Sequence, residues 1–357
     1  MAGINIDSVE EIKALDKENV LGSVEQLPDQ IEQVWSELEL IKIPTGYGEI
    51  KSIVVSGMGG SALGARVIQA LYKKSLPCPM EVVNHYELPG YVGENSLVVL
   101  SSYSGTTEET LASAEDAKKR KAKIAVITAG GELLKLAEDN DYPYYKIDPK
   151  HNPSKQPRMA IGSSIMGQLA LFQKLNLISV EDEEVNGVVS YLREAAKKLS
   201  PSVIEENVAK KMARMAVGKL VFIVSAEHLA GAGHVMNNQI NENAKNMTAE
   251  LVIPELNHHY MEGLPNPESI KDKAVFLLFS SDLYHLHVQK RFPLTHDVIV
   301  KNGLEAVTYK MKANNKFLQV WELIQLGAYM NFYLAMLNGV NPAPIPWVDY
   351  FKKQLKK

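Results

Sequence analysis

The chain has 357 residues, a formal net charge of −4 and a sequence pI near 6.2, and 46% of its residues are hydrophobic. This length predicts two domains, and the slightly acidic balance excludes a global field that attracts nucleic acid or anionic membranes. Cys78 is the only cysteine, which excludes an intrachain disulfide and a cysteine-rich metal site.

The first half of the chain alternates short apolar runs with helical patterns. Residues 1–7 lack the basic and apolar regions of a signal peptide, so we expect a cytoplasmic protein. The apolar runs that predict buried strands are residues 53–55, 97–100, 124–128 and 144–147. The helical patterns cover residues 61–73, 107–121, 131–139 and 161–175. Continuously apolar strands that alternate with helices predict an α/β fold, with a parallel sheet covered on both faces.

The second half repeats this alternation. Its strand candidates are residues 220–224, 250–253 and 274–279, and its helix candidates are residues 232–246 and 317–337. The run 323–337 is interrupted by Gln325 and Asn331, so it is too short an apolar stretch for a membrane span. We place the domain boundary near residue 190, which gives domains 1–190 and 191–357. The two halves are a candidate structural duplication.

Two of the predicted strands end in small hydroxyl residues and glycines. Residues 57–62 read Gly-Met-Gly-Gly-Ser-Ala, and residues 101–107 read Ser-Ser-Tyr-Ser-Gly-Thr-Thr. Open parallel sheets bind ligands beyond the carboxyl ends of their strands, where glycines and helix N-termini expose backbone N–H groups to an anion. Helix capping alone explains the first turn equally well, but capping needs only one hydroxyl of the second turn. The pair of turns therefore predicts a cup for a phosphate group.

Two other phosphate-binding patterns fit the first turn poorly. A dinucleotide-binding turn ends in a third glycine, whereas Ser61 and Ala62 follow Gly60 here, and the acidic residue expected about 20 residues later is absent, because Glu81 lies beyond two prolines. A Walker A loop needs a Gly-Lys-Ser/Thr ending, which the chain lacks at this point.

Residues that can carry proton chemistry stand elsewhere in the chain. Glu242 lies among three asparagines and a glutamine, an unusual setting for a solvated helix face, although a helix-end carboxylate with polar neighbours is the simpler interpretation. His258 and His259 follow a predicted strand and are candidates for an acid–base group, a surface histidine or, less readily, a metal ligand. Arg158 and Lys352 are possible fixed cations, and each has an ordinary local role as its alternative.

These segments together resemble a known family. Residues 102–110, Ser-Tyr-Ser-Gly-Thr-Thr-Glu-Glu-Thr, are similar to the phosphate loop of the sugar isomerase (SIS) domain. With Pro-Arg-Met-Ala at 157–160, Asn-Glu-Asn-Ala-Lys at 241–245 and Glu-Leu-Asn-His at 255–258, the chain resembles the bifunctional phosphoglucose/phosphomannose isomerase family. The resemblance implies two SIS-type domains, each a parallel sheet flanked by helices.

The resemblance also implies roles for individual residues. The phosphate would be held by Ser61, Ser102, Ser104 and Thr107, with Gly59 and Gly60 lining the sugar. Glu242 would be the base, Arg158 the stabiliser of the enediolate, and His258 with Lys352 the ring-opening pair. The histidine would come from a neighbouring subunit, so a homodimer would share its active sites.

The expected activity is an aldose–ketose isomerisation of glucose 6-phosphate, and also mannose 6-phosphate, with fructose 6-phosphate. It would need no cofactor and no metal, because the hydrogen moves as a proton through a cis-enediol. A non-catalytic phosphosugar sensor and a dinucleotide-dependent oxidoreductase are the alternatives. The absence of a basic helix-turn-helix segment disfavours a DNA-binding sensor, and the broken glycine pattern disfavours the oxidoreductase.

Overall fold

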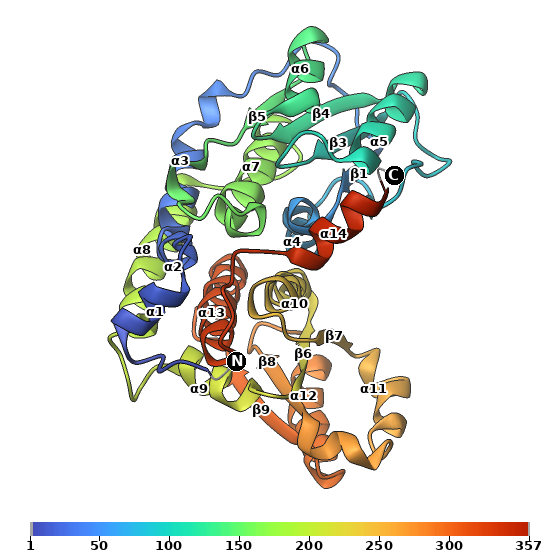
Figure 1. Cartoon of the computed structure of the whole chain (residues 1–357). Coiled ribbons are helices and arrows are strands. Elements are labelled where there is room, and N and C mark those ends of the chain that lie inside the picture. Colours follow the sequence, from blue (N-terminus) through green and yellow to red (C-terminus); the bar gives the residue numbers. More distant parts are fainter. Residues whose placement is uncertain (1–2, 356–357) are drawn as a thin grey trace.

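The computed structural model describes residues 3–355. In this part of the chain the strands form two parallel sheets with helices on their faces, which confirms the predicted α/β fold (Figure 1). The first sheet has the order β2-β1-β3-β4-β5 and the second the order β7-β6-β8-β9. Both sheets thus share the order second–first–third–fourth, as a structural duplication would produce.

The first half contains an N-terminal helical segment and the first sheet. Its helices are α1 (Val9–Leu15), α2 (Val20–Glu25), α3 (Leu27–Ser36), α4 (Leu63–Leu71), α5 (Glu108–Lys119), α6 (Gly131–Asp139) and α7 (Ile161–Lys174). Its strands are β1 (Ser52–Gly57), β2 (Met80–Val83), β3 (Ser96–Ser101), β4 (Lys123–Thr128) and β5 (Tyr144–Lys146).

The second half begins after α8 (Asp182–Leu199), in which the predicted boundary at residue 190 falls. Its strands are β6 (Leu220–Ala226), β7 (Thr248–Ile253), β8 (Ala274–Ser280) and β9 (Glu305–Lys310). Its helices are α9 (Val208–Ala216), α10 (Ala230–Ala244), α11 (Leu256–His259), α12 (Leu286–Lys301), α13 (Lys316–Leu337) and α14 (Pro346–Leu355). Of the helices in residues 3–355, none has the length and hydropathy needed to cross a bilayer.

Local sequence signals fix several helix ends. Glu181 and Glu184 form a capping box at the start of α8, where each carboxylate accepts from the backbone N–H of the other residue. In α5, Glu108 and Glu109 occupy the first turn and Lys118 and Lys119 the last, which complements the helix dipole at both ends.

One hydrophobic core runs through both halves. It joins residues of β1 and β3 to residues of β6 and β8 through four central helices, α4, α7, α10 and α13. A separate cluster fills the other face of the first sheet beneath α5 and α6. Figure 1 shows α10 and α13 between the two sheets, so the halves meet through buried helices rather than across a polar linker.

Candidate functional site

The two hydroxyl-rich turns lie side by side at the switch point of the first sheet. β1 and β3 are neighbours, and their last residues are in register, with Gly57 opposite Ser101. Because β2 lies on one side of β1 while β3, β4 and β5 follow on the other, the loops after β1 and β3 flank the point where the strand order reverses. The predicted cup therefore stands where parallel sheets bind ligands.

Hydrogen bonds join the two turns. The Ser61 hydroxyl accepts from the backbone N–H of Tyr103 at 3.0 Å, and the Ser101 hydroxyl donates to the Ser61 carbonyl at 2.7 Å. Within the second turn the hydroxyl oxygens of Ser102 and Thr107 are 2.7 Å apart, and Ser104 lies 3.5 Å from Ser102. The predicted phosphate ligands are thus gathered in one place.

A carboxylate from the second half reaches this cup. Gly59 has a φ of 50°, and a Cβ atom at this glycine would lie 4.0 Å from Oε1 of Glu242. Gly60 packs against Arg158, whose Cα would be 3.2 Å from a Cβ atom at Gly60. Glu242 lies near the end of α10, so the contact between α4 and α10 brings the first turn and this carboxylate together.

Arg158 is buried and held on every side. Its Nη1 lies 3.5 Å from Glu242 Oε2, and the side chain of Arg158 is 2% exposed against 28% for Glu242. Its Nη2 donates to the carbonyls of Pro342 and Ala343, at 2.8 and 2.7 Å, and its Nε donates to the side-chain oxygen of Asn243. Burial lowers the pKa of Arg158, and the neighbouring Glu242 carboxylate opposes that shift. The result is a fixed cation beside a partly accessible carboxylate.

Two of the predicted site residues, His258 and Lys352, do not contact the others within one chain. His258 lies on α11 and Lys352 on α14, and both are exposed. Among residues 3–355, neither side chain forms a hydrogen bond or ion pair with Glu242, Arg158 or the cup. Figure 1 shows α11 on the outer side of β7, away from α4. α14, by contrast, begins three residues after Ala343, whose carbonyl binds Arg158, so its start lies at the site.

The corresponding switch point of the second sheet is filled by its own side chains. Between β6 and β8, Glu227 accepts from the backbone N–H of His285 at 2.9 Å, and both His228 and Ser281 contact Gln319 Oε1, at 2.9 and 2.6 Å. Burial lowers the pKa of His228 to about 4, so this histidine is neutral. Because Glu227 also places a carboxylate here, a phosphate is disfavoured at this point.

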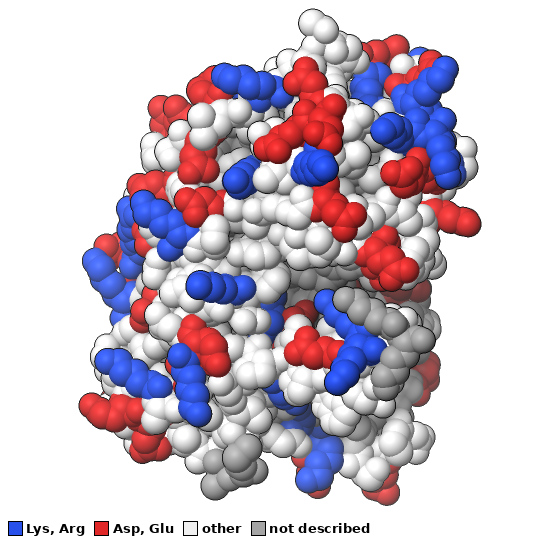
Figure 2. Space-filling model, turned by 45° about the horizontal axis from the view of Figure 1, so that its top comes forward, with Lys and Arg blue, Asp and Glu red and all other residues white. Residues whose placement is uncertain are grey.

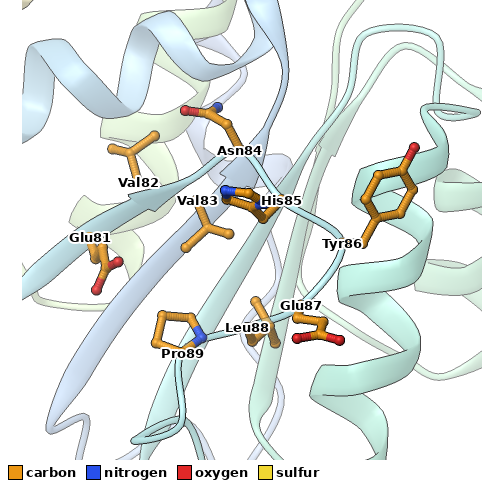
Figure 3. Close-up of a pocket in the computed structure, with 9 residues that line it drawn as sticks. All are labelled: Glu81, Val82, Val83, Asn84, His85, Tyr86, Glu87, Leu88 and Pro89. Atoms are coloured by element: carbon orange, nitrogen blue, oxygen red, sulfur yellow. The ribbon is translucent and has the colours of Figure 1, made fainter.

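A large pocket lies away from the candidate site, and none of the predicted site residues line it. It measures about 670 Å³ and is lined by the continuous segment from Glu81 to Pro89. Figure 3 shows these residues on β2 and the following loop, with Tyr86 beside α5. Among residues 3–355, no three His, Cys, Asp or Glu side chains group in a way that could hold a metal ion. On the face drawn in Figure 2, basic and acidic side chains are interspersed.

Comparison with known proteins agrees with this arrangement. Residues 48–177 match the SIS domain family, and residues 205–355 match the family described as the bacterial phospho-glucose isomerase C-terminal SIS domain. The bifunctional phosphoglucose/phosphomannose isomerase of Caldicellulosiruptor bescii is 33% identical over 341 residues, which cover 93% of this chain and 98% of the relative. The protein of the same name from Aquifex aeolicus is 30% identical over 335 residues, with coverages of 94% and 99%.

Solved structures show the same fold at lower sequence identity. A hypothetical protein from Thermus thermophilus superposes with a TM-score of 0.73 at 17% identity, covering 97% of this chain and 93% of the other. This likeness supports the arrangement of the two sheets and their helices.

Proposed function

Because the chain belongs to the bifunctional phosphoglucose/phosphomannose isomerase family, we propose that it interconverts glucose 6-phosphate and mannose 6-phosphate with fructose 6-phosphate. The observation that carries this proposal is the convergence of Glu242, Arg158 and the first turn at one point. A phosphate anchor alone serves binding, whereas an anchor beside a carboxylate and a fixed cation suits enolisation.

The proposed reaction moves two protons, one from C2 to C1 and one from the C2 hydroxyl to O1, and needs no change of oxidation state in the protein. Glu242 removes the proton from C2 of the open-chain aldose, which leaves a negative oxygen at C1, and the proton of the C2 hydroxyl passes to this oxygen. The carboxyl then returns its proton to C1 as the carbonyl forms at C2, which gives the ketose. Arg158 faces Glu242 at 3.5 Å, so its charge is available to the negative oxygen that develops between these steps.

The phosphate turns determine which carbon meets the base. Ser61, Ser102, Ser104 and Thr107 would bind the 6-phosphate through their hydroxyls and the N–H groups around them. Gly59 leaves the space beside Glu242 open, since a glycine brings no side chain there. This anchoring would hold C1 and C2 at the carboxylate for substrates of either configuration at C2.

Ring opening is assigned to His258 and Lys352. α14 starts beside Arg158, and Lys352 lies six residues beyond its first residue, about 9 Å along the axis. His258 is exposed on the outer side of the second sheet, so we assign the histidine of each site to a neighbouring copy of the chain. The catalytic unit is then a homodimer.

The proposal is tested by Glu242→Gln in a coupled assay that converts mannose 6-phosphate or glucose 6-phosphate to fructose 6-phosphate. We expect kcat to fall about a thousandfold, because the amide cannot accept the proton. Binding of fructose 6-phosphate, measured by calorimetry, should remain within a few-fold of wild type. Glu227→Gln is the matched control, since this carboxylate lies at the other switch point and should not affect kcat.

Two outcomes would contradict the proposal. Wild-type kcat in Glu242→Gln would remove this residue as the base. Tight binding of fructose 6-phosphate by a wild-type protein that converts neither aldose phosphate would instead identify a sensor.

A further inference from the structure

Four polar groups beneath the candidate site form a closed ring of hydrogen bonds. Arg158 Nε donates to Asn243 Oδ1, Asn243 Nδ2 donates to Asn331 Oδ1 at 2.8 Å, and Asn331 Nδ2 donates to Gln239 Oε1 at 3.1 Å. Gln239 Nε2 closes the ring by donating to the backbone carbonyl of Arg158 at 3.2 Å. The three amide side chains are fully buried, so water does not compete for these bonds.

The donors and acceptors around the ring can be assigned in only one way, and Asn331 determines that assignment. The amide nitrogen of Asn331 also donates to the carbonyl of Gly327, one turn earlier in α13, at 2.6 Å. With its nitrogen committed to two acceptors, Asn331 can present only its oxygen to Asn243. Asn243 must then turn its nitrogen toward Asn331, which leaves its oxygen for Arg158 Nε. Carbonyls bind Nη2 of the same guanidinium, while Nη1 donates to Gln156 Oε1 at 3.1 Å and lies 3.5 Å from Glu242 Oε2.

Packing does not account for an asparagine at this position. α13 is apolar through most of its length, and its residues around position 331 belong to the main core. A wholly apolar cluster of similar shape would be neutral or stabilising compared with polar side chains whose bonds only compensate their burial, whereas loss of Asn331 alone leaves buried groups of Asn243 and Gln239 without it. Hydrogen bonds in a buried network are also strongly directional and mutually reinforcing. The asparagine therefore fits a role in orientation better than a role in stability.

We propose that Asn331 is a positioning residue of the isomerase, which acts through Asn243 to fix the guanidinium of Arg158 against Glu242. This inference rests on the proposed function, because it gives Arg158 its role at the enediolate. Asn331 does not touch substrate in this arrangement.

The test uses Asn331→Leu and Asn331→Ser with Gln325→Leu as the matched control. Leucine keeps the shape of the asparagine, while serine keeps a bond to the Gly327 carbonyl but cannot reach Asn243. Gln325 is a buried amide on the same helix that donates to the Leu192 carbonyl, outside the ring. We expect kcat to fall about tenfold in both Asn331 variants, with KM within twofold, because Arg158 acts on the transition state. Gln325→Leu should keep kcat within twofold, whatever happens to the melting temperature.

A double-mutant cycle with Arg158→Lys separates positioning from a general loss of structure. A lysine has no Nε–H for Asn243, so adding Asn331→Ser to Arg158→Lys should lower kcat by less than twofold further. If the two losses multiply instead, the inference is overturned, while the role of Arg158 stands. If Arg158→Lys alone keeps wild-type kcat, the proposed role of Arg158 fails and the inference fails with it. Should Asn331→Leu not fold, Asn331→Ser supplies both measurements.

Discussion

Lys245 is the residue next to the site whose chemistry the family resemblance leaves unassigned. It ends α10 with a φ of 51°. Its Nζ donates to the carbonyls of Glu242 and Pro342, at 2.6 and 2.8 Å, and the Pro342 carbonyl also accepts from Arg158. Although part of the side chain is exposed, desolvation of the ammonium group and the nearby Arg158 lower the pKa of Lys245 to about 8, against an opposing effect of Glu242.

This lowered pKa predicts a pH dependence of the reaction. Below pH 8 the ammonium adds positive potential where the enediolate forms, and above pH 8 that charge is lost. We expect kcat/KM to fall about threefold to tenfold as pH rises through about 8, to a lower plateau. Lys245→Met should lie near that plateau at every pH. The substrate phosphate ionises near pH 6, so its titration lies outside this window.

The measurement is a kcat/KM profile between pH 7 and pH 10 for wild type, Lys245→Met and Lys245→Arg. Arginine keeps its charge over this range, so its profile should lack the step near pH 8. A step of the same size in Lys245→Met would assign the ionisation to another group.

The candidate residues of the site could be predicted one by one, but the hydrogen bonds that support them could not. Hydroxyls and glycines at strand ends predict an anion cup, and the structure gathers them. The amides around Glu242 were visible as an unusual composition, and the structure shows Gln239 and Asn243 committed to the ring under Arg158. Asn331 was visible only as an interruption of an apolar run. No local pattern indicates which distant side chain it faces, because that depends on how α10 packs on α13.

At the scale of elements, the contact between α4 and α10 sets the distance from the first hydroxyl-rich turn to Glu242. Gly231 makes this contact close. A Cβ atom at Gly231 would lie 2.4 Å from the carbonyl oxygen of Arg66 and 2.5 Å from Cα of Val67. Both neighbours are backbone atoms, so they cannot move away as a side chain could.

We therefore expect Gly231→Ala to destabilise the fold by about 3 kcal/mol, since relief requires α4 and α10 to separate. The melting temperature should fall by about 4 °C. Gly187→Ala is the matched control, because Gly187 is in α8 and a Cβ atom there would have no heavy atom within 4 Å. Alanine at this position should stabilise by about 0.5 to 1 kcal/mol. Equal melting temperatures for the two variants would show that α4 and α10 adjust without cost.

Among the strands, sequence patterns missed two of the four sheet edges, β2 and β9, and predicted the other two, β5 and β7. β2 and β9 lie at opposite ends of their sheets, and neither is a continuous apolar run, since each exposes part of its length. The central strands β1, β3, β6 and β8 are buried on both faces and were predicted from their apolar runs. A strand that is buried on both faces is a continuous apolar run, which can be recognised in the sequence. An edge strand can carry exposed polar residues and then lacks this pattern.

At the scale of the whole molecule, the two halves share a strand order but contribute different parts of the candidate site. The first sheet gathers the hydroxyls of Ser61, Ser102 and Thr107 at its switch point, while the second fills the same place with His228, Ser281 and Gln319. The second half instead supplies Glu242 at the end of α10 and the carbonyls that hold Arg158. A continuous core across both halves fits this division, because a site built from two sheets needs them fixed to each other.

The assignment of His258 to a neighbouring copy predicts complementation between two inactive variants. Glu242→Gln lacks the base, and His258→Ala lacks the ring-opening histidine. In a hybrid dimer one site would carry both defects and the other would be intact. Mixed subunits should therefore recover about a quarter of wild-type activity, since half of the dimers are hybrids and half of their sites are complete.

The control pair is Glu242→Gln with Arg158→Lys, two residues that contribute to the site of their own chain. Hybrids of this pair contain no intact site, so activity should stay at the level of the separate variants. Formation of hybrids can be verified by native mass spectrometry with one chain carrying an affinity tag. Verified hybrids of Glu242→Gln and His258→Ala without recovered activity would place the histidine of each site in the same chain as the base. His258→Ala with wild-type kcat, alongside an inactive His259→Ala, would instead transfer the role to the adjacent histidine.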